Sequence, residues 1–390
     1  MKAVFKWSIR FILLLVLVAG IAATWGYWEL KASLPVLDGS LALPNLSGDV
    51  SVERDSLGMA TISAQSRIDV ARAMGFLHGQ ERFFQMDLMR RRAAGELSAL
   101  VGLAALDVDK RVRVHQLRLR SQAIVERFTQ EEKSILYAYV DGVNEGLHRL
   151  GSKPFEYWLL RTTPEDWRAE DTVLTAYSMY LVLQASTPEK ELTRLKVKHL
   201  TPSSLYAFLR APGTQWDAPL WGEPLLPTLI PSEDSLGNWR SKVDVPLKRS
   251  EGIEPAFPGS NSWAVAGSLS KTGSAILQND MHLGLQVPNI WFRAQIRYGA
   301  NHEYQVTGVS LPGTPLIIAG SNGHIAWGYT NSYGDFSDVI AIEQTTPGKY
   351  LTPNGEREFD IANEIIQVKG NEDEKLSIEN TEWGPVVETA

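Results

Sequence analysis

The chain has 390 residues, of which 44% are hydrophobic, so it can bury a large core in one big domain or in two. Its net charge is −7, and no block of like charge marks a nucleic-acid surface, so we expect no nucleic-acid partner. The absence of cysteine excludes disulfides, thiolate metal sites and a cysteine nucleophile, and it is compatible with an exported protein.

Residues 1–30 have the pattern of an export signal. Three basic residues precede an uncharged apolar run, Phe11 to Ala23, and a weak small-x-small cleavage pattern lies at Gly20-Ile21-Ala22. Residues 11–28 are also just long enough to cross a bilayer, with the aromatic residues near Trp28 at the outer interface. The sequence therefore predicts a cleaved signal or a membrane anchor. A buried helix of a soluble domain would leave the basic flank unexplained.

Residues 31–230 read as a mainly helical region. After a Pro-bearing linker, Val50 to Ile62 alternate in a way that predicts a hairpin. Ser66 and Asp69 then form a capping-box pattern that opens a long helix, with Gly102 as its expected stop.

Two more helices are predicted from local signals. Thr129 and Glu132 form a second capping box, and Pro164-Glu165-Asp166-Trp167 opens a helical region that runs through Leu183. Residues 201–259 are richer in proline and read as loops. Within them, residues 231–259 are predicted to be a spacer peptide.

The most informative stretch is Gly259-Ser260-Asn261-Ser262-Trp263, at the head of a strand-like run. If the Gly259–Ser260 bond is cut, the Ser260 hydroxyl can attack a carbonyl, and its freed α-amine can act as the general base. An α-amine has a pKa of about 7.7 to 8, close to the ideal for a base at neutral pH. No histidine or aspartate partner is then required.

The motifs around Ser260 resemble the penicillin acylase family of N-terminal nucleophile hydrolases, and the resemblance runs from about Leu34 to the last residue. The matching stretches are Val52-Glu53-Arg54-Asp55, Gly75-Phe76-x-His78-x-Gln80-Glu81-Arg82, Pro258-Gly259-Ser260-Asn261-x-Trp263, Asn279-Asp280-x-His282-Leu283, Asn322-Gly323-His324-Ile325-Ala326-Trp327-Gly328 and Asn331-x-x-Gly334-Asp335.

This resemblance implies an α+β fold of the four-layer αββα sandwich type. It implies a periplasmic precursor that cleaves itself at Gly259–Ser260 into an α/β heterodimer and hydrolyses linear N-acyl amides through an acyl-enzyme on Ser260. Residues 260–390 would be the first part of the β-chain. Because family members continue further, the chain is expected to be roughly the N-terminal half of a precursor.

The resemblance also assigns roles around the nucleophile. One oxyanion donor would be the backbone N–H of Asn331, and the second an asparagine side chain that matches no position up to Ala390. His282 would position Ser260 or its amine. His78 and His324 are expected to be structural polar groups.

A calcium loop is predicted at Asp335-Phe336-Ser337-Asp338, which offers two carboxylates and a backbone carbonyl as hard oxygen ligands. The resemblance adds an acidic residue from the helical half, Glu189 or Glu191. One structural calcium ion is therefore expected.

Four residues correspond by resemblance to the acyl pocket: Met179, Leu183, Leu283 and Ala319. Family members with a phenylacetyl pocket tend to carry aromatic residues at several of these positions. The aliphatic set here leaves room for an aliphatic acyl chain, and both β-lactam side chains and N-acyl homoserine lactones are candidates.

Two other functions fit parts of the sequence. Ser268-Leu269-Ser270-Lys271 spells the Ser-x-x-Lys motif of serine β-lactamases and penicillin-binding proteins, but its Gly-flanked setting predicts a hairpin turn rather than the start of a buried helix. The chain could also be a membrane-tethered, inactive acylase-like binding protein.

Overall fold

The computed structural model describes residues 2–184, 187–214, 216–217, 219, 221–237, 239, 259–331 and 336–388. The chain forms two compact units, each described here by itself. The first unit comprises Met1–Val182, Pro258–Asn331 and Thr345–Ala390, and the second comprises Leu183–Phe257 and Ser332–Gln344.

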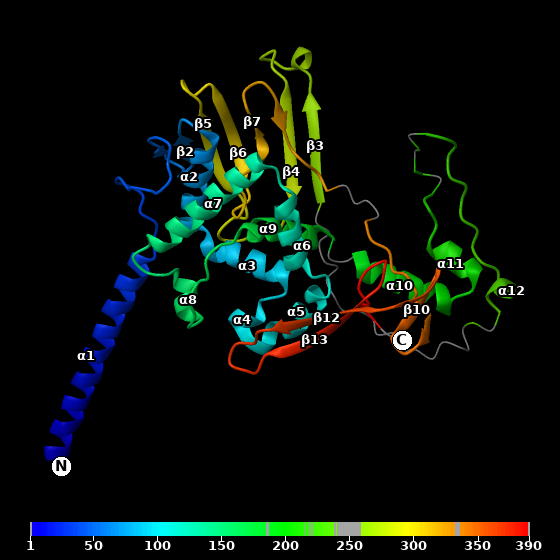
Figure 1. The fold of residues 1–390 in the computed structure, drawn as a ribbon, viewed down its shortest axis with the longest axis horizontal. Coiled ribbons are helices and arrows are strands. Elements are labelled where there is room, and N and C mark those ends of the chain that lie inside the picture. The colour runs from blue at the N-terminus through cyan, green and yellow to red at the C-terminus, as the bar shows by residue number, and fades with distance from the viewer. Residues whose placement is uncertain are drawn as a thin grey trace. The chain divides into compact units, whose positions relative to one another are not determined.

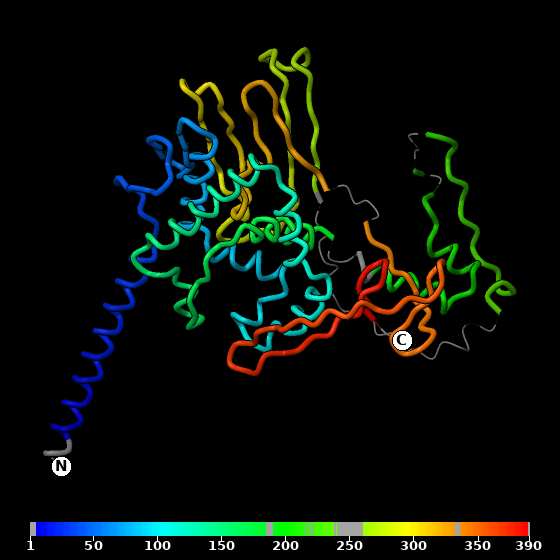
Figure 2. The backbone as a smooth tube through the Cα atoms, viewed as in Figure 1, coloured from blue at the N-terminus to red at the C-terminus, as the bar shows by residue number. Residues whose placement is uncertain are grey.

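Helix α1 (Lys2–Ala32) extends away from the rest of the first unit (Figures 1 and 2). Its segment Phe5–Ala32 is long and apolar enough to cross a membrane, and its side chains pack against nothing over most of its length. This is the region in which the sequence predicts a signal or an anchor.

The other helices that begin in the first unit are α2 (Arg67–Glu81), α3 (Phe83–Ala94), α4 (Ser98–Val101), α5 (Leu106–Arg113), α6 (Leu117–Arg127), α7 (Gln130–His148), α8 (Phe155–Leu159) and α9 (Ala169–Gln184). The second unit contains α10 (Thr187–Leu200), α11 (Ser203–Leu209) and α12 (Glu233–Leu236).

A six-stranded sheet combines segments from both halves of the chain. Its order is β1 (Ser51–Arg54), β2 (Ala60–Ser63), β5 (Phe292–Tyr298), β6 (Tyr304–Ser310), β7 (Ile317–Ser321) and β8 (Ala326–Trp327). Strands β2 and β5 pair in parallel, with Ile62 opposite Ile296, and the other pairs are antiparallel. The predicted early hairpin is therefore confirmed, and it forms one edge of the sheet.

The remaining strands form three smaller sheets. They are β3 (Gly259–Val265) with β4 (Ile276–His282), β9 (Gln344–Thr346) with β10 (Lys349–Thr352) and β11 (Gly355–Glu358), and β12 (Asp360–Ile366) with β13 (Glu374–Asn380). The mixture of helices and antiparallel strands confirms an α+β protein.

Helices α2 and α7 lie in backbone contact beside the sheet (Figure 1). Each carries glycines four residues apart, Gly75 and Gly79 on α2 and Gly142 and Gly146 on α7. A Cβ added at any of these four positions would lie 1.9–2.2 Å from a carbonyl oxygen of the other helix. The four glycines therefore set how closely the two helices can approach.

The core of the first unit lies between this helix pair and the sheet. Ile62 and Ala294 from paired strands are fully buried, as are Met74 on α2 and Tyr139 on α7. Fully burying a side chain of the size of Ile62 or Met74 contributes about 1.5 to 3 kcal/mol. Segments more than 200 residues apart therefore depend on one another for stability.

The single helix expected from Ser66 to Gly102 is wrong. Ser66 does cap α2 by accepting from Asp69 N, but the helix ends at Arg82, whose φ of −136° is not helical. Helix α3 then ends at Gly95, with φ 66°, before Gly102 closes the short α4. The apolar period continues across the break because all three segments face the same core.

Other helix signals are confirmed. Thr129 and Glu132 form the predicted capping box of α7, and the predicted third helix is α9, which begins five residues after Pro164. The interpretation of residues 201–259 as loops misses the short helices α11 and α12.

His78 is a fully buried structural group, as predicted. Its Nδ1 lies 2.7 Å from Tyr139 Oη and its Nε2 lies 3.1 Å from Ser310 Oγ, while Tyr139 Oη accepts from Gly313 N at 2.9 Å. Ser310 Oγ donates to Phe292 O, so it accepts the hydrogen of His78 Nε2. Burial, together with the charge of Arg82, lowers the pKa of His78 to about 3.

We expect His78 to make stability pH-dependent. The unfolded histidine takes up a proton below its ordinary pKa of 6.5, whereas the folded one stays neutral down to about pH 3, so stability is complete above pH 6.5 and falls below it. The loss should be about 2 kcal/mol at pH 5. Urea unfolding measures the free energy of unfolding at pH 7 and at pH 5. Between these two pH values, His78→Gln should lose less of this free energy than the wild type. The exposed His324→Gln should lose as much as the wild type, and equal losses in all three proteins would contradict the prediction.

Candidate active site

The β3–β4 hairpin places Ser260 next to its predicted partners. The strands pair antiparallel, so Gly259 lies opposite His282 and Ser260 opposite Met281. The Gly259–Ser260 bond therefore lies at the open end of the hairpin, beside the histidine that the sequence singles out. The pairing runs over seven residue pairs, from Gly259–His282 to Val265–Ile276, and the connection between the strands contains the 3-10 turn Gly267–Leu269.

Asn331 brings a backbone donor to the serine. Its N–H donates to Ser260 Oγ at 2.6 Å, across 71 positions of sequence. This hydrogen bond brings the Asn331 N–H, the predicted oxyanion donor, next to the Ser260 hydroxyl. The first unit thus joins two predicted site residues from distant segments.

Asn279 holds these two segments together. Its Nδ2 donates to Asn261 O at 3.3 Å and to Tyr329 O at 3.1 Å, so one side chain ties the residue after Ser260 to the segment that leads to Asn331. A Cβ at Gly328 would lie 2.7 Å from the Asn279 side chain. This role is absent from the sequence predictions, although Asn279 belongs to the motif that contains His282. Asn279 lies opposite Ser262 on the neighbouring strand, and this strand register identifies it as a neighbour of Ser260 and Asn261.

His282 contacts the residues around Ser260. Its Nε2 lies 2.8 Å from Asp280 Oδ2 and 3.2 Å from Asn261 Nδ2. A carboxylate only accepts, so Asp280 favours the form of His282 with hydrogen on Nε2. The ring is half exposed, at 49% of its side-chain surface, so solvent reaches this end of the hairpin.

Comparison with known proteins identifies the family. The penicillin amidase family model matches residues 49–390. The chain belongs to the penicillin amidase family. It is 31% identical to the penicillin acylase 2 proenzyme of a Pseudomonas species over 371 residues, which cover 92% of this chain and 46% of that protein. It is 29% identical to the acyl-homoserine lactone acylase QuiP of Pseudomonas aeruginosa, over 92% of this chain and 42% of that one.

The chain spans about half the length of the curated relatives that it matches. Among solved structures, a thermostable penicillin G acylase from Alcaligenes faecalis matches 45% of this chain and 98% of its own, with 24% identity and a TM-score of 0.39.

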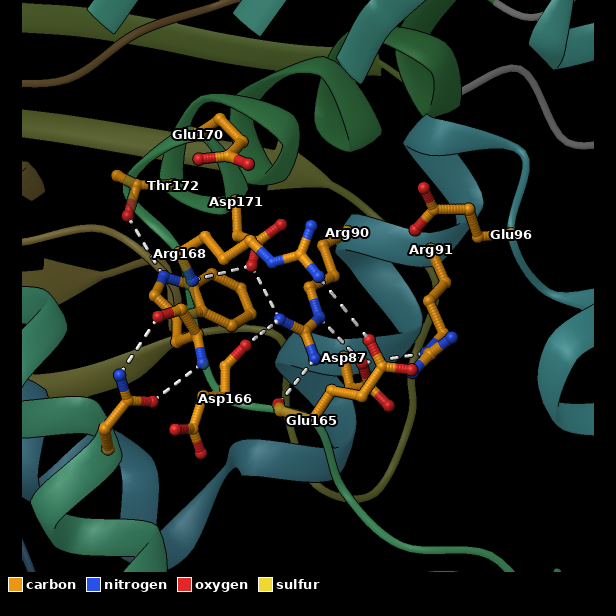
Figure 3. A network of polar contacts seen from close by, with 12 residues as sticks. Asp87, Arg90, Arg91, Glu96, Glu165, Asp166, Arg168, Glu170, Asp171 and Thr172 are labelled. Atoms are coloured by element: carbon orange, nitrogen blue, oxygen red, sulfur yellow. Dashed lines mark hydrogen bonds and ion pairs between the residues drawn. The ribbon is translucent and has the colours of Figure 1, made fainter. Parts of the chain in front are cut away.

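The first unit has a buried ion network that holds the start of α9 (Figure 3). Arg90 Nε donates to Asp87 at 2.7 Å, and Arg90 Nη1 donates to Asp171 on α9 at 2.6 Å. Burial alone would lower the pKa of Arg90, but the adjacent charges of Asp171 and Asp87 raise it overall. The guanidinium also donates to the carbonyls of Glu165 and Asp166, so its buried N–H groups are satisfied. Breaking such a network by removing one partner typically costs about 3 to 5 kcal/mol.

A cavity of about 800 Å³ in the first unit contains one predicted pocket residue, Met179 on α9. Other apolar residues line it from the segment after α1, from α3, from the residues before α4 and α8, and from α8, α9 and the segment between β4 and β5: Leu34, Pro35, Phe83, Phe84, Leu88, Met89, Leu97, Pro154, Phe155, Val182, Val287, Pro288 and Ile290. Leu283, which follows β4, and Ala319, on β7, lie outside this lining. Leu183 is the first residue of the second unit.

The predicted calcium ligands belong to the second unit. Asp335 and the side chain of Glu189 lie outside the described residues, Ser337 is half-buried and Asp338 is exposed. Glu191 pairs with Arg194 on the same helix. Within the described residues, no group of three His, Asp or Glu side chains is arranged to hold a metal ion.

The Ser-x-x-Lys stretch is a turn, as its sequence predicts. Gly267–Leu269 is a 3-10 turn between β3 and β4, and Ser270 Oγ donates to Ser274 O at 2.7 Å within the turn. The motif needs serine and lysine one turn apart on a buried helix. This geometry removes the β-lactamase-like alternative.

Asn279→Asp should weaken the catalytic geometry. The isosteric carboxylate cannot donate to Asn261 O or Tyr329 O, so the segment that carries Asn331 should shift from Ser260. A displacement of about 1 Å can cost about 10²-fold in rate. Cleavage at Gly259–Ser260, followed by intact mass, should slow by that order. The exposed Asn354→Asp should behave as wild type, and normal cleavage in Asn279→Asp would contradict this role.

Proposed function

We propose that Ser260 becomes the N-terminal nucleophile of an exported acylase that hydrolyses linear N-acyl amides. The observation that carries the proposal is the Asn331 N–H bond to Ser260 Oγ, at the end of the strand where the Gly259–Ser260 bond lies opposite His282. Family membership supports an acylase-type amidohydrolase. The whole enzyme's activity is part of the proposal, because the chain spans about half of its relatives.

The precursor reaction uses the serine hydroxyl. Ser260 Oγ attacks the carbonyl carbon of Gly259, its proton passes to the Ser260 nitrogen and the C–N bond breaks, so that an ester to Oγ replaces the amide and the α-amine is free. Water then hydrolyses the ester, which releases the carboxylate of Gly259 and restores the Ser260 hydroxyl. Until this bond is cut, the nitrogen of Ser260 is an amide nitrogen and cannot serve as a base.

The acylase reaction then uses both groups of Ser260. The α-amine takes the Oγ proton as Oγ attacks the acyl carbon of the substrate, and the proton passes to the departing amine. The Asn331 N–H stabilises the oxyanion, with the second donor that the family resemblance assigns to a later asparagine. Water, activated by the same amine, releases the acid and restores Ser260.

For the substrate we propose an amide with an aliphatic acyl chain. Met179 lies in a largely apolar cavity, and the other three predicted pocket residues are also aliphatic. The proposal rests on these four aliphatic side chains alone, because Phe83, Phe84 and Phe155 also line the cavity around Met179. We include the αββα layering, the α/β heterodimer and a periplasmic location in this proposal.

A substrate panel tests the function. The full-length gene product should be assayed with N-acyl homoserine lactones of increasing chain length and with penicillin G, beside Ser260→Ala. We expect release of aliphatic acids by a mature chain that begins at Ser260. An uncut chain that binds but releases no acid would support the inactive binding protein instead.

We further propose that Asp335, Ser337 and Asp338 hold a structural calcium ion, with Glu189 as a fourth ligand. Carboxylate, hydroxyl and carbonyl oxygens are the ligands that calcium prefers. We expect chelator to lower the melting temperature of the wild type but not of the Asp335→Asn/Asp338→Asn variant. The exposed pair Glu372→Gln/Asp373→Asn should keep the calcium response. An unchanged wild-type melting temperature would mean that the loop is an acidic turn.

A further inference from the structure

The C-terminal end of α1 is fixed to the body of the first unit. Ser152 N donates to Ala32 O at 3.1 Å, and Ser152 Oγ donates to Glu29 Oε2 at 2.5 Å. One turn earlier, Trp25 packs edge-on against Trp158 of α8, with ring centroids 5.8 Å apart. These contacts join the last two turns of α1 to α8 and to the segment just before it.

Exposed apolar side chains gather at this junction. On α8, Phe155 is 45%, Trp158 41% and Leu159 64% exposed, and Leu34 and Leu37, just after α1, are 62% and 60% exposed. Leu34 and Phe155 line the same cavity, so the two segments are neighbours. Contiguous apolar surface of this kind marks an interaction site.

The position of α1 indicates what covers this surface. The uncharged run begins after Arg10, and residues 11–28 are just long enough to cross the hydrocarbon core, so Trp25 and Trp28 lie toward its outer end. Trp25 and Trp28 then lie at the membrane interface, where tryptophan is enriched. Because Trp158 packs against Trp25, α8 lies at the same depth.

The charges nearby fit the same surface. Lys31 lies in the last turn of α1, with Nζ 5.4 Å from the Trp28 ring, and it is exposed. Arg161, two residues after α8, is exposed as well. Basic side chains just beyond an aromatic belt face lipid phosphates and are attracted to an anionic membrane surface.

We propose that α8 and the Leu34–Leu37 segment lie in the interface of the leaflet at the C-terminal end of α1. The partner is the lipid bilayer itself. The first unit is then held against the membrane in one orientation by a spanning helix and an interfacial contact. This inference does not depend on acylase activity.

The absence of cysteine allows a direct test with single introduced cysteines. Leu159→Cys in the full chain carries an environment-sensitive NBD label, and the chain is placed in phosphatidylcholine–phosphatidylglycerol vesicles. The control is Leu119→Cys on α6, where the leucine is 59% exposed and α6 is drawn well away from α1 (Figure 1). Circular dichroism confirms that both variants fold.

We expect the label at position 159 to emit at shorter wavelength, to lose emission to doxyl-labelled lipids and to resist dithionite, while the label at position 119 behaves as in water. Equal exposure of both labels to water would overturn the proposal. Equal shielding of both would also overturn it, because the body would then adsorb without orientation. Recovery of a mature, membrane-free chain that starts at Ala23 would remove the spanning helix and overturn it as well.

Discussion

Ser260→Ala should abolish both cleavage at Gly259–Ser260 and acylase turnover. In the proposed mechanism the Ser260 hydroxyl attacks the carbonyl both in self-cleavage and in acylase turnover. The α-amine of Ser260 exists only after cleavage. Removing the nucleophile of a serine hydrolase costs on the order of 10⁴ to 10⁶ in rate. Intact mass should show one uncut chain, and released acid should fall to background.

The matched control is Ser262→Ala, two residues along the same strand. Ser262 Oγ donates only to Gln278 O among its described contacts, whereas the Asn331 N–H donates to Ser260 Oγ. Its loss should leave cleavage and turnover near wild type. Cleavage at the same bond in Ser260→Ala would rule out Ser260 as the nucleophile.

Gly142→Ala should unfold or strongly destabilise the first unit. The new Cβ would lie 1.9 Å from Arg72 O on α2, and backbone on both helices leaves no side chain that can move aside. In an exposed helix the same change would gain about 1 kcal/mol. Here we expect a net loss of at least about 3 kcal/mol in urea unfolding, a large share of a typical stability of about 5 to 15 kcal/mol.

Gly26→Ala on α1 is the control, because a Cβ there meets nothing within 4 Å. It should leave unfolding of the body unchanged. A Gly142→Ala protein as stable as the wild type would show that α2 and α7 can separate without cost. The close approach of the two helices would then have no role in stability.

Local signals in the sequence predict much of the secondary structure correctly. The caps at Ser66 and Thr129, the early hairpin and the turn after Gly267 each depend on a few adjacent residues. The helix break at Arg82 is missed because apolar periodicity indicates only which side of a helix faces the core. It does not report a change in the direction of the helix axis.

The sequence by itself determined the family through its motifs, and it singled out Ser260 as the proposed nucleophile because a serine after glycine at the head of a strand is a local pattern. Only the tertiary structure decided which groups meet Ser260. The Asn331 amide, the link through Asn279 and the parallel pairing of β2 with β5 each join segments 18 to 234 positions apart. Such contacts depend on the helix pair and the sheet packing together, and no short stretch of residues encodes them.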